Sequence, residues 1–332
     1  MKTKLNFYSL LFLIVLCFSM NSCSNDFLEN PTTKTKDSII LKATKELKLK
    51  MRVNLLNRDY LVILPGSHSA DSNTKYPVVF GFHGVGNNYT QMKRYLEAKA
   101  NEKNYILILP NGTAGVSNVI GMSFRGWNAG DCCGPAEYRD AKDVEFISQL
   151  IKEVVEKYNG DEKRIYLTGF SNGAMMCYRA ACELSDKIAA IAPVSGSMNT
   201  GSCNDKTRPV PLLQIHSTND NIVPYNGGFS IASFFGSLKL TKLTFRSVIY
   251  GLEKWAMING CDRDVTVTEK EGYSILEWKN CKNNIATTIH YRLNNGAHTW
   301  PGSIREVGKT EPSNVINATD MIFDFFDGKK LN

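Results

Sequence analysis

The most constraining feature of this sequence is the pentapeptide Gly169–Gly173, which consists of Gly, Phe, Ser, Asn and Gly. It lies between a predicted strand, Arg164–Thr168, and a helix predicted over Ser171–Leu184. In so tight a turn, side chains at the two glycine positions would collide with neighbouring backbone. The turn lifts the Ser171 hydroxyl out of the sheet and points the helix N-terminus at any negative charge that develops there. Ser171 is therefore a candidate nucleophile.

Strand-like and helix-like segments alternate along most of the chain. The longest predicted helix, Ala141–Tyr158, carries apolar residues on one face at helical spacing. The further predicted strands are Pro77–Phe82, Tyr105–Leu109, Ile188–Val194, Leu212–His216, Val265–Glu271, Ser274–Trp278 and Thr287–Leu293. The further predicted helices are Gln91–Asn101, Leu252–Asn259 and Ser313–Phe326. This alternation predicts an α/β fold with a mostly parallel central sheet and helices on both faces.

Two segments near the start of this pattern alternate apolar and polar residues, namely Glu46–Val53 and Asp59–Leu64. With a turn near Leu56–Arg58, they predict an antiparallel hairpin at the N-terminal edge of the sheet. Residues 111–139 are rich in glycine and are predicted to be mainly loops. Since no internal repeat or low-complexity linker follows residue 45, residues 46–330 are expected to form a single domain.

The first 45 residues have a different composition. Lys2 and Lys4 precede a short apolar stretch that ends before Cys23, as in a secretory signal, and the stretch is too short for a comfortable membrane span. Residues 20–23 resemble a bacterial lipobox, which predicts a signal peptide over 1–22, lipidation of Cys23 and a polar tether over 23–45. The alternative is an ordinary secretion signal with Cys23 an incidental thiol. Both alternatives predict an extracytoplasmic protein, anchored to the bacterial envelope membrane by lipid or secreted.

Composition excludes several classes of protein. The 332 residues are 43% hydrophobic and 21% charged, which is typical of a globular chain with a large core and not of a disordered chain, a collagen or a coiled coil. The formal net charge is +7, and loss of Lys2 and Lys4 with the signal segment leaves +5. The remaining charges are interspersed without a basic block, so no nucleic-acid partner is expected.

Seven cysteines follow Cys23, and an oxidising compartment would favour disulfides among them. The number is odd, so at least one thiol is expected to stay unpaired. Cys261 and Cys281 flank a predicted two-strand unit and are the best candidate pair. Metal binding is the weaker interpretation, because the sequence has no Cys-x2-Cys or His-x3-His spacing. We expect neither a metal nor an organic cofactor.

A serine hydroxyl is a poor nucleophile at neutral pH and needs an adjacent base. Of the five histidines, His298 lies in the loop Gly296–Gly302 after the last predicted strand, where it can reach over the turn at Ser171. The order nucleophile, acid, histidine leaves only His298 and His290 late enough in the chain. His290 lies within a predicted strand, so a structural role is favoured for it.

The acid that orients the base is expected after another strand. Asp220 follows Leu212–His216 and is placed to hold the second nitrogen of the histidine. A turn-capping role is the alternative for Asp220, and Asp262 and Asp264 are the fallback candidates for the acid.

Backbone N–H groups are expected to bind the oxyanion of the reaction. One candidate is Asn172, at the helix start, and the second lies in the loop after Pro77–Phe82, where Val85 is favoured and Gly84 is the alternative. His83, at the start of this loop, is expected to be buried and structural.

Several motifs occur in one order along the chain. They are His83-Gly84, Arg125–Asn128 followed by Asp131–Gly134, Asp143–Ile147, the pentapeptide with Ser171, Ala189–Gly196, Asp220 with Val223–Tyr225, and Gly296–Gly302. Over residues 46–326 the chain resembles the polyhydroxybutyrate depolymerase/feruloyl esterase group of α/β hydrolases, close to carbohydrate esterase family one. The segments around Cys132-Cys133 and His298 carry this resemblance more specifically than the pentapeptide does.

The resemblance implies an α/β-hydrolase fold and a secreted serine esterase with Ser171, Asp220 and His298 as its triad. It places Trp127 and Trp300 near the site, where they could border a substrate, although buried packing is an equal alternative. The segment 226–251 is long for its position, and Phe229, Phe234, Phe235 and Phe245 could form a lid or could simply pack locally.

The favoured substrates are feruloyl or acetyl esters on plant hemicellulose, with a hydroxybutyrate polyester as the alternative. A protein of another class, a noncatalytic glycan-binding lipoprotein on a hydrolase scaffold, would lack a member of the triad. All three candidate residues are present, which weighs against that hypothesis.

Overall fold

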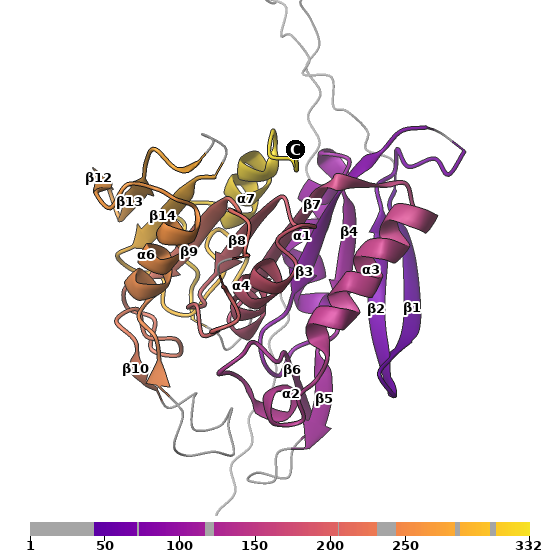
Figure 1. The fold of residues 1–332 in the computed structure, drawn as a ribbon, viewed down its shortest axis with the longest axis horizontal. Coiled ribbons are helices and arrows are strands. Elements are labelled where there is room, and N and C mark those ends of the chain that lie inside the picture. The colour runs from indigo at the N-terminus through magenta and orange to yellow at the C-terminus, as the bar shows by residue number, and fades with distance from the viewer. Residues whose placement is uncertain are drawn as a thin grey trace, which may run out of the picture. The chain divides into compact units, whose positions relative to one another are not determined.

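A large mixed sheet forms the centre of the computed structural model (Figure 1). The structure describes residues 43–71, 73–116, 123–204, 206–230, 244–282, 286–305 and 310–332. The predicted signal segment, Cys23 and all but the last residues of the predicted tether lie outside these ranges. Residues 41–332 form one compact unit.

Ten strands of the described ranges make up the sheet, in the order β1-β2-β4-β3-β7-β8-β9-β14-β13-β12. Neighbours from β4 to β14 are parallel, and the pairs at both edges are antiparallel, as expected for the N-terminal hairpin. The strands are β1 (Lys45–Val53), β2 (Leu56–Leu64), β3 (Tyr76–Phe82), β4 (Ile106–Pro110), β7 (Gly160–Phe170), β8 (Ala190–Val194), β9 (Leu212–Ser217), β12 (Val265–Lys270), β13 (Tyr273–Trp278) and β14 (Thr288–Leu293).

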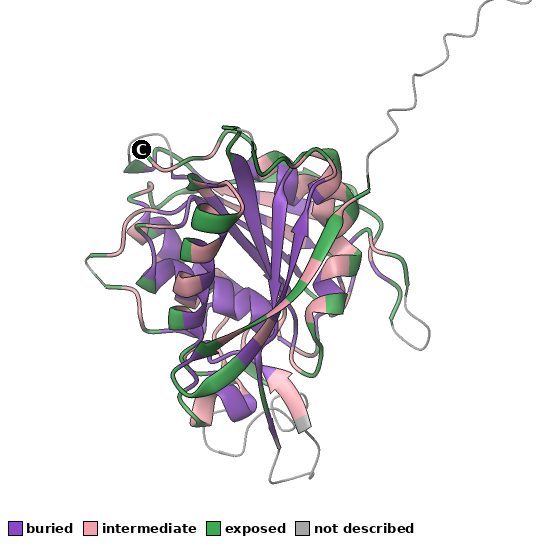
Figure 2. Ribbon diagram, turned by 90° about the vertical axis from the view of Figure 1, so that its right-hand side faces the viewer, coloured by how far each residue is buried: buried purple, intermediate pink, exposed green. Residues whose placement is uncertain are grey.

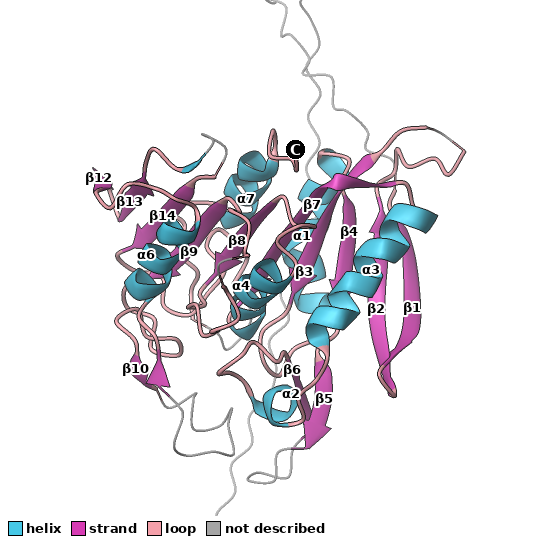
Figure 3. Cartoon of the chain, in the orientation of Figure 1, coloured by secondary structure: helices cyan, strands magenta, loops and turns pink. Residues whose placement is uncertain are grey.

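Helices cover both faces of this sheet (Figures 1 and 3). The helices are α1 (Tyr89–Glu102), α2 (Gly134–Tyr138), α3 (Asp143–Lys157), α4 (Asn172–Glu183), α6 (Val248–Ile258) and α7 (Ala318–Phe326). Apolar residues of α3, α4 and α6 share one core with one face of the sheet, and those of α1 and α7 share a second core with the other face. The central strands are buried on both faces for this reason, whereas the edge strand β1 alternates between exposed and partly buried residues (Figure 2).

Local differences from the sequence prediction have physical causes. The turn of the first hairpin lies at Asn54 and Leu55, which have positive φ values of 44° and 69°, and not at Leu56–Arg58. This two-residue loop pairs Val53 directly with Leu56, as tight hairpins require. Helix α7 begins five residues later than predicted, because the Asn317 side chain caps it by accepting a hydrogen bond from the backbone N–H of Asp320 (3.1 Å).

Short elements lie within residues 111–139, which were predicted to be mainly loops, and within the long segment 226–251. Strands β5 (Thr113–Val116) and β6 (Ser123–Gly126) pair with each other, and α2 follows them. Strands β10 (Gly228–Phe229) and β11 (Thr244–Phe245) form a second small pair. No helix in the described ranges combines the length and the apolar character that crossing a bilayer requires.

A buried ion pair ties the edge hairpin to α3 and to the loops beside α4. The Arg58 guanidinium lies 2.7 Å from a carboxylate oxygen of Asp143, and both side chains are at most 3% exposed. Arg58 also donates to the Asn111 carbonyl and lies over the Phe146 ring, while Asp143 accepts from the backbone N–H of Asn128 (2.7 Å). Each charge is therefore held by several partners.

Replacing Arg58 with Met should lower the free energy of unfolding by about 3–5 kcal/mol, because the Asp143 charge is left buried without its partner. Urea unfolding followed by circular dichroism measures this change. As a matched control, Lys152→Ala breaks the exposed ion pair with Glu156 and should change the value by less than about 0.5 kcal/mol. Equal effects of the two substitutions would contradict the role given to the buried pair.

Candidate active site

The turn after β7 has the geometry expected for the pentapeptide. Ser171, between β7 and α4, has a φ of 57°, which serine adopts only where its surroundings impose it. A Cβ atom on Gly169 would lie 2.5 Å from the carbonyl carbon of Gly173, and one on Gly173 would collide with the carbonyl oxygen of Phe82. Glycine is required at both positions because strand and helix approach this closely.

Ser171, Asp220 and His298 follow β7, β9 and β14, which belong to the parallel part of the sheet. Since parallel strands end at one edge, the three residues lie along that edge. The His298 Nδ1–H donates to Asp220 Oδ2 at 2.8 Å. The His298 ring centroid lies 4.8 Å from that of Phe170, the residue directly before Ser171. The imidazole therefore lies beside the turn and is oriented by the carboxylate.

The Asp220 carboxylate is buried and fully hydrogen-bonded. Its Oδ1 atom accepts from the backbone N–H groups of Ile222 and Val223, both at 2.9 Å. Its Oδ2 atom faces His298 and also lies 3.3 Å from Nε2 of His216. Burial alone would raise the pKa of Asp220, but hydrogen bonds from His216 and His298 outweigh it and hold the pKa well below its usual range. Asp220 is therefore an anion at neutral pH.

The loop that carries His298 is fixed by Asn219, whose role the sequence analysis missed. The Asn219 Oδ1 atom accepts from the backbone N–H groups of Gly296 (3.2 Å) and Ala297 (2.8 Å), and also from the Ser217 hydroxyl. Its Nδ2–H donates to Asn295 Oδ1 at 2.7 Å. Adjacent residues thus orient the histidine in two ways, since Asn219 holds its backbone and Asp220 its ring.

The two candidate loops for oxyanion binding lie beside Ser171. The backbone N–H of Gly84 already donates to Gln91 Oε1 at 2.9 Å, so this alternative donor is occupied. Among the described residues, the N–H groups of Val85 and Asn172 have no protein acceptor. A Cβ atom on Gly84 would lie 3.3 Å from Cβ of Ser171, which shows how closely this loop approaches the turn. Val85 and Asn172 remain the candidate donors.

His83 holds the loop that contains Gly84 and Val85 in place. It is buried, its Nε2 atom accepts from the N–H of Gly112 (2.9 Å), and its Nδ1–H donates to the Gly84 carbonyl (2.7 Å). Burial lowers the pKa of His83 to about 4, so it is neutral at pH 7.

The structure overturns the prediction that Trp127 and Trp300 border a substrate, because both rings are buried, with exposed fractions of 0% and 1%. The Trp127 indole N–H donates to the His83 carbonyl (2.9 Å), and its backbone is paired with the side chain of Asn172. The Trp300 ring stacks on Tyr95 with centroids 4.9 Å apart. Both tryptophans support the site by packing, which was the stated alternative.

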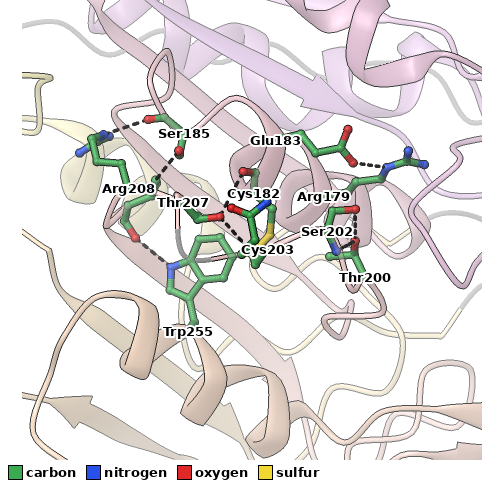
Figure 4. Close-up of a disulfide and its surroundings, with 12 residues drawn as sticks. Arg179, Cys182, Glu183, Ser185, Thr200, Ser202, Cys203, Thr207, Arg208 and Trp255 are labelled. Carbon is green, nitrogen blue, oxygen red and sulfur yellow. Dashed lines mark hydrogen bonds and ion pairs between the residues drawn. A yellow bond between two sulfur atoms is a disulfide. The ribbon is translucent and has the colours of Figure 1, made fainter.

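Six cysteines form three disulfides in the described ranges, including the expected pair Cys261–Cys281. The other two are Cys132–Cys133 and Cys182–Cys203, and the seventh, Cys177, is a buried free thiol whose pKa burial raises well above the usual value. Figure 4 shows Cys182–Cys203 linking the end of α4 to the segment before β9.

Hydrogen bonds reinforce this link (Figure 4). Figure 4 shows the Arg208 side chain beside Ser185, to whose carbonyl it donates (2.9 Å). Arg208 also donates to the Ile188 carbonyl (2.6 Å), and the Trp255 indole N–H donates to the Val210 carbonyl (2.8 Å). The loop between β8 and β9 is thereby fixed at several points.

The remaining candidates lie elsewhere. Asp262 and Asp264 are exposed and make no contact with His298. His290 is buried in β14, where its Nε2 atom accepts from the Tyr225 hydroxyl (3.0 Å). Within the described ranges, no group of three or more His, Cys, Asp or Glu side chains could hold a metal ion.

The lid hypothesis concerns residues 226–251, of which 231–243, with Phe234 and Phe235, lie outside the described residues. Phe229 is 61% exposed. Phe245 is partly buried and packs beside Val223 and Met175.

Sequence comparison relates the chain to known esterases. A family model described as Phospholipase/Carboxylesterase matches residues 67–249. Feruloyl esterase B of Piromyces equi is 30% identical over 247 residues, which are 73% of this chain and 42% of that protein. A bifunctional acetylxylan esterase/xylanase of Neocallimastix patriciarum is 32% identical over 51% of this chain and 22% of that protein. The chain thus spans less than two thirds of the length of these relatives.

Structure comparison supports the fold. An acetyl xylan esterase from Aspergillus awamori superposes with a TM-score of 0.56 at 13% identity, covering 85% of this chain and 98% of that one. An S-formylglutathione hydrolase from Agrobacterium tumefaciens has a TM-score of 0.50 at 10% identity, covering 78% of this chain and 92% of that one. At such low identity these likenesses concern the fold alone, and together with the family match they confirm the predicted α/β-hydrolase fold.

The buried histidines should make stability depend on pH. Burial lowers the pKa of His290 to about 3, against about 6.5 in the unfolded chain. Below pH 6.5 the unfolded state therefore binds more protons than the folded state. The free energy of unfolding decreases as the pH is lowered from about 6.5 to about 3. His290→Gln should reduce this fall by up to about 1.4 kcal/mol per pH unit. Urea unfolding at pH 7 and pH 4.5 tests this, and an unchanged difference between the two pH values would contradict it.

Proposed function

Because the chain belongs to the phospholipase/carboxylesterase family, we propose that it hydrolyses carboxylic esters through a serine acyl-enzyme. The observation that carries this proposal is the 2.8 Å hydrogen bond between His298 and Asp220, at the sheet edge where the strained turn presents Ser171. The feruloyl and acetylxylan esterases among its relatives support an ester hydrolase.

Asp220 determines which nitrogen of His298 acts as the base. Since the Nδ1–H of His298 donates to the carboxylate, Nε2 carries the free lone pair and accepts the Ser171 proton. The Ser171 oxygen attacks the ester carbonyl, and the protonated Nε2 then gives its proton to the departing alcohol. In the second half-reaction His298 removes a proton from water, which attacks the acyl-enzyme and releases the acid and the Ser171 hydroxyl.

Two backbone N–H groups are assigned to the oxyanion in both half-reactions. The N–H groups of Val85 and Asn172 have no acceptor in the part of the chain that the structure describes, while Gln91 and His83 hold the first loop in place. Each donor of this kind contributes about 3–4 kcal/mol of transition-state stabilisation.

The proposed substrates are feruloyl or acetyl esters on plant hemicellulose, as the names of the relatives suggest. A polysaccharide of this kind would be met outside the cytoplasm. The signal-like residues 1–22 and the lipobox-like segment before Cys23 support an extracytoplasmic protein with a lipid anchor, and three disulfides are consistent with an oxidising compartment.

A substrate panel tests the proposal with purified protein. The panel contains aryl acetates, methyl ferulate, acetylated xylan and hydroxybutyrate oligomers. We expect the protein to hydrolyse some of these esters and not others, with methyl ferulate or acetylated xylan among those hydrolysed. Ser171→Ala and His298→Ala should each lower kcat at least about 10³-fold, because the members of a triad act as a unit. Initial rates measure both effects.

Ser67→Ala and His68→Ala are the matched controls, since both residues lie in the segment before β3, away from Ser171 in the chain and the sheet. They should retain wild-type rates. Unchanged turnover in a folded Ser171→Ala protein would overturn the acyl-enzyme proposal. Absence of turnover of every ester by the wild type would favour the noncatalytic alternative.

A further inference from the structure

We infer that His216 is a positioning residue for the proposed triad, and that it holds the Asp220 carboxylate through a second imidazole. The inference rests on the proposed function and extends it to a residue outside the triad. Two imidazoles share one oxygen of Asp220, with Nδ1 of His298 at 2.8 Å and Nε2 of His216 at 3.3 Å. His216 is itself completely buried.

The hydrogen-bond partners of His216 determine where its proton lies. The Gln214 Nε2 group donates to the Gly196 carbonyl (3.3 Å) and to Nδ1 of His216 (3.1 Å). Turning the Gln214 amide over would place its oxygen against the Gly196 carbonyl, so the amide has one orientation. Because Nδ1 of His216 accepts, its Nε2 atom carries the proton.

Two acceptors lie near this proton. The Nε2–H of His216 donates to the Val223 carbonyl (2.9 Å), and the same nitrogen lies 3.3 Å from Asp220 Oδ2. Residue 223 therefore holds the acid loop in two ways, since its N–H donates to Asp220 Oδ1 while its carbonyl accepts from His216. The carboxylate is fixed at both oxygens, and Oδ2 stays directed at His298.

The arrangement has a specific consequence for the reaction. An ionised carboxylate with a free lone pair could rotate or bind water, and His298 would then lose its preferred tautomer for part of the time. The His216 imidazole lies against that side of the carboxylate without reaching the surface, so it acts on the reaction only through Asp220. Its loss should therefore lower kcat and leave KM unchanged.

Two substitutions separate the donor from the bulk of the side chain. His216→Phe keeps an aromatic ring but removes the donor, whereas in His216→Gln the amide nitrogen lies as many bonds from Cα as Nε2 of histidine does. We expect His216→Phe to lower kcat about 10- to 100-fold, the range of one hydrogen bond to a charged group, with KM within twofold. His216→Gln should retain kcat within about threefold for the same reason.

Inactivation by a fluorophosphonate gives a readout that does not depend on the choice of ester. The rate of labelling at Ser171 should fall in His216→Phe in parallel with kcat, and the low-field proton resonance of His298 Nδ1–H should shift. His290→Gln is the matched control, because this histidine is equally buried on the neighbouring strand but makes no contact with Asp220. It should leave the labelling rate within twofold.

The outcomes distinguish this inference from the proposed function. If the wild type is not labelled at Ser171, the proposed function fails. If the wild type is labelled and folded His216→Phe is labelled equally fast, the role of His216 is overturned. Should His216→Phe not fold, His216→Asn replaces it, since its amide is one bond too short to reach Asp220. Equal kcat values for His216→Asn and His216→Gln would then contradict the inference.

Discussion

The close approach of α4 to the end of β3 is the constraint on which the rest of the site depends. Gly173 lies so near the carbonyl of Phe82 that no side chain fits between them. The chain between β7 and α4 must therefore turn within one residue, and Ser171 takes the positive φ that this turn demands. The same contact brings the loop after Phe82 next to Ser171, so that one packing contact positions both the nucleophile and the two N–H groups assigned to the oxyanion.

Much of this arrangement could be predicted because it depends on residues that are close together in the sequence. Buried strands appear as apolar runs, and Ser171, Asp220 and His298 each follow the end of one of them. The pairing of His216 with Asp220, and of Asn219 with the loop at Ala297, could not be predicted in the same way. A histidine that ends an apolar strand has the same local pattern whether its ring meets a carboxylate or a carbonyl.

The tryptophans show a second limit of the sequence. An aromatic residue near a motif can face a substrate or the core, and nothing in the neighbouring residues decides between them. Trp127 is buried because the side chain of Asn172 pairs with both its N–H and its carbonyl, which draws the backbone of residue 127 against α4. This contact joins residues 45 positions apart, so only the folded chain reveals it.

The two buried carboxylates of the described residues, Asp143 and Asp220, have different kinds of partner. Asp143 is neutralised by Arg58, a permanent cation, and the pair joins the edge hairpin to α3 at a distance from the reaction. Among the described residues, Asp220 has no such partner. Two backbone N–H groups and the His298 imidazole donate to it, and the His216 imidazole lies 3.3 Å from Oδ2. A permanent cation beside Asp220 would cancel the charge that must stabilise an imidazolium on His298 during the reaction. N–H donors of this kind keep the buried carboxylate fixed while leaving its negative charge available to His298. A buried carboxylate that serves as the acid of a triad is therefore better held by histidine and backbone N–H groups than by arginine.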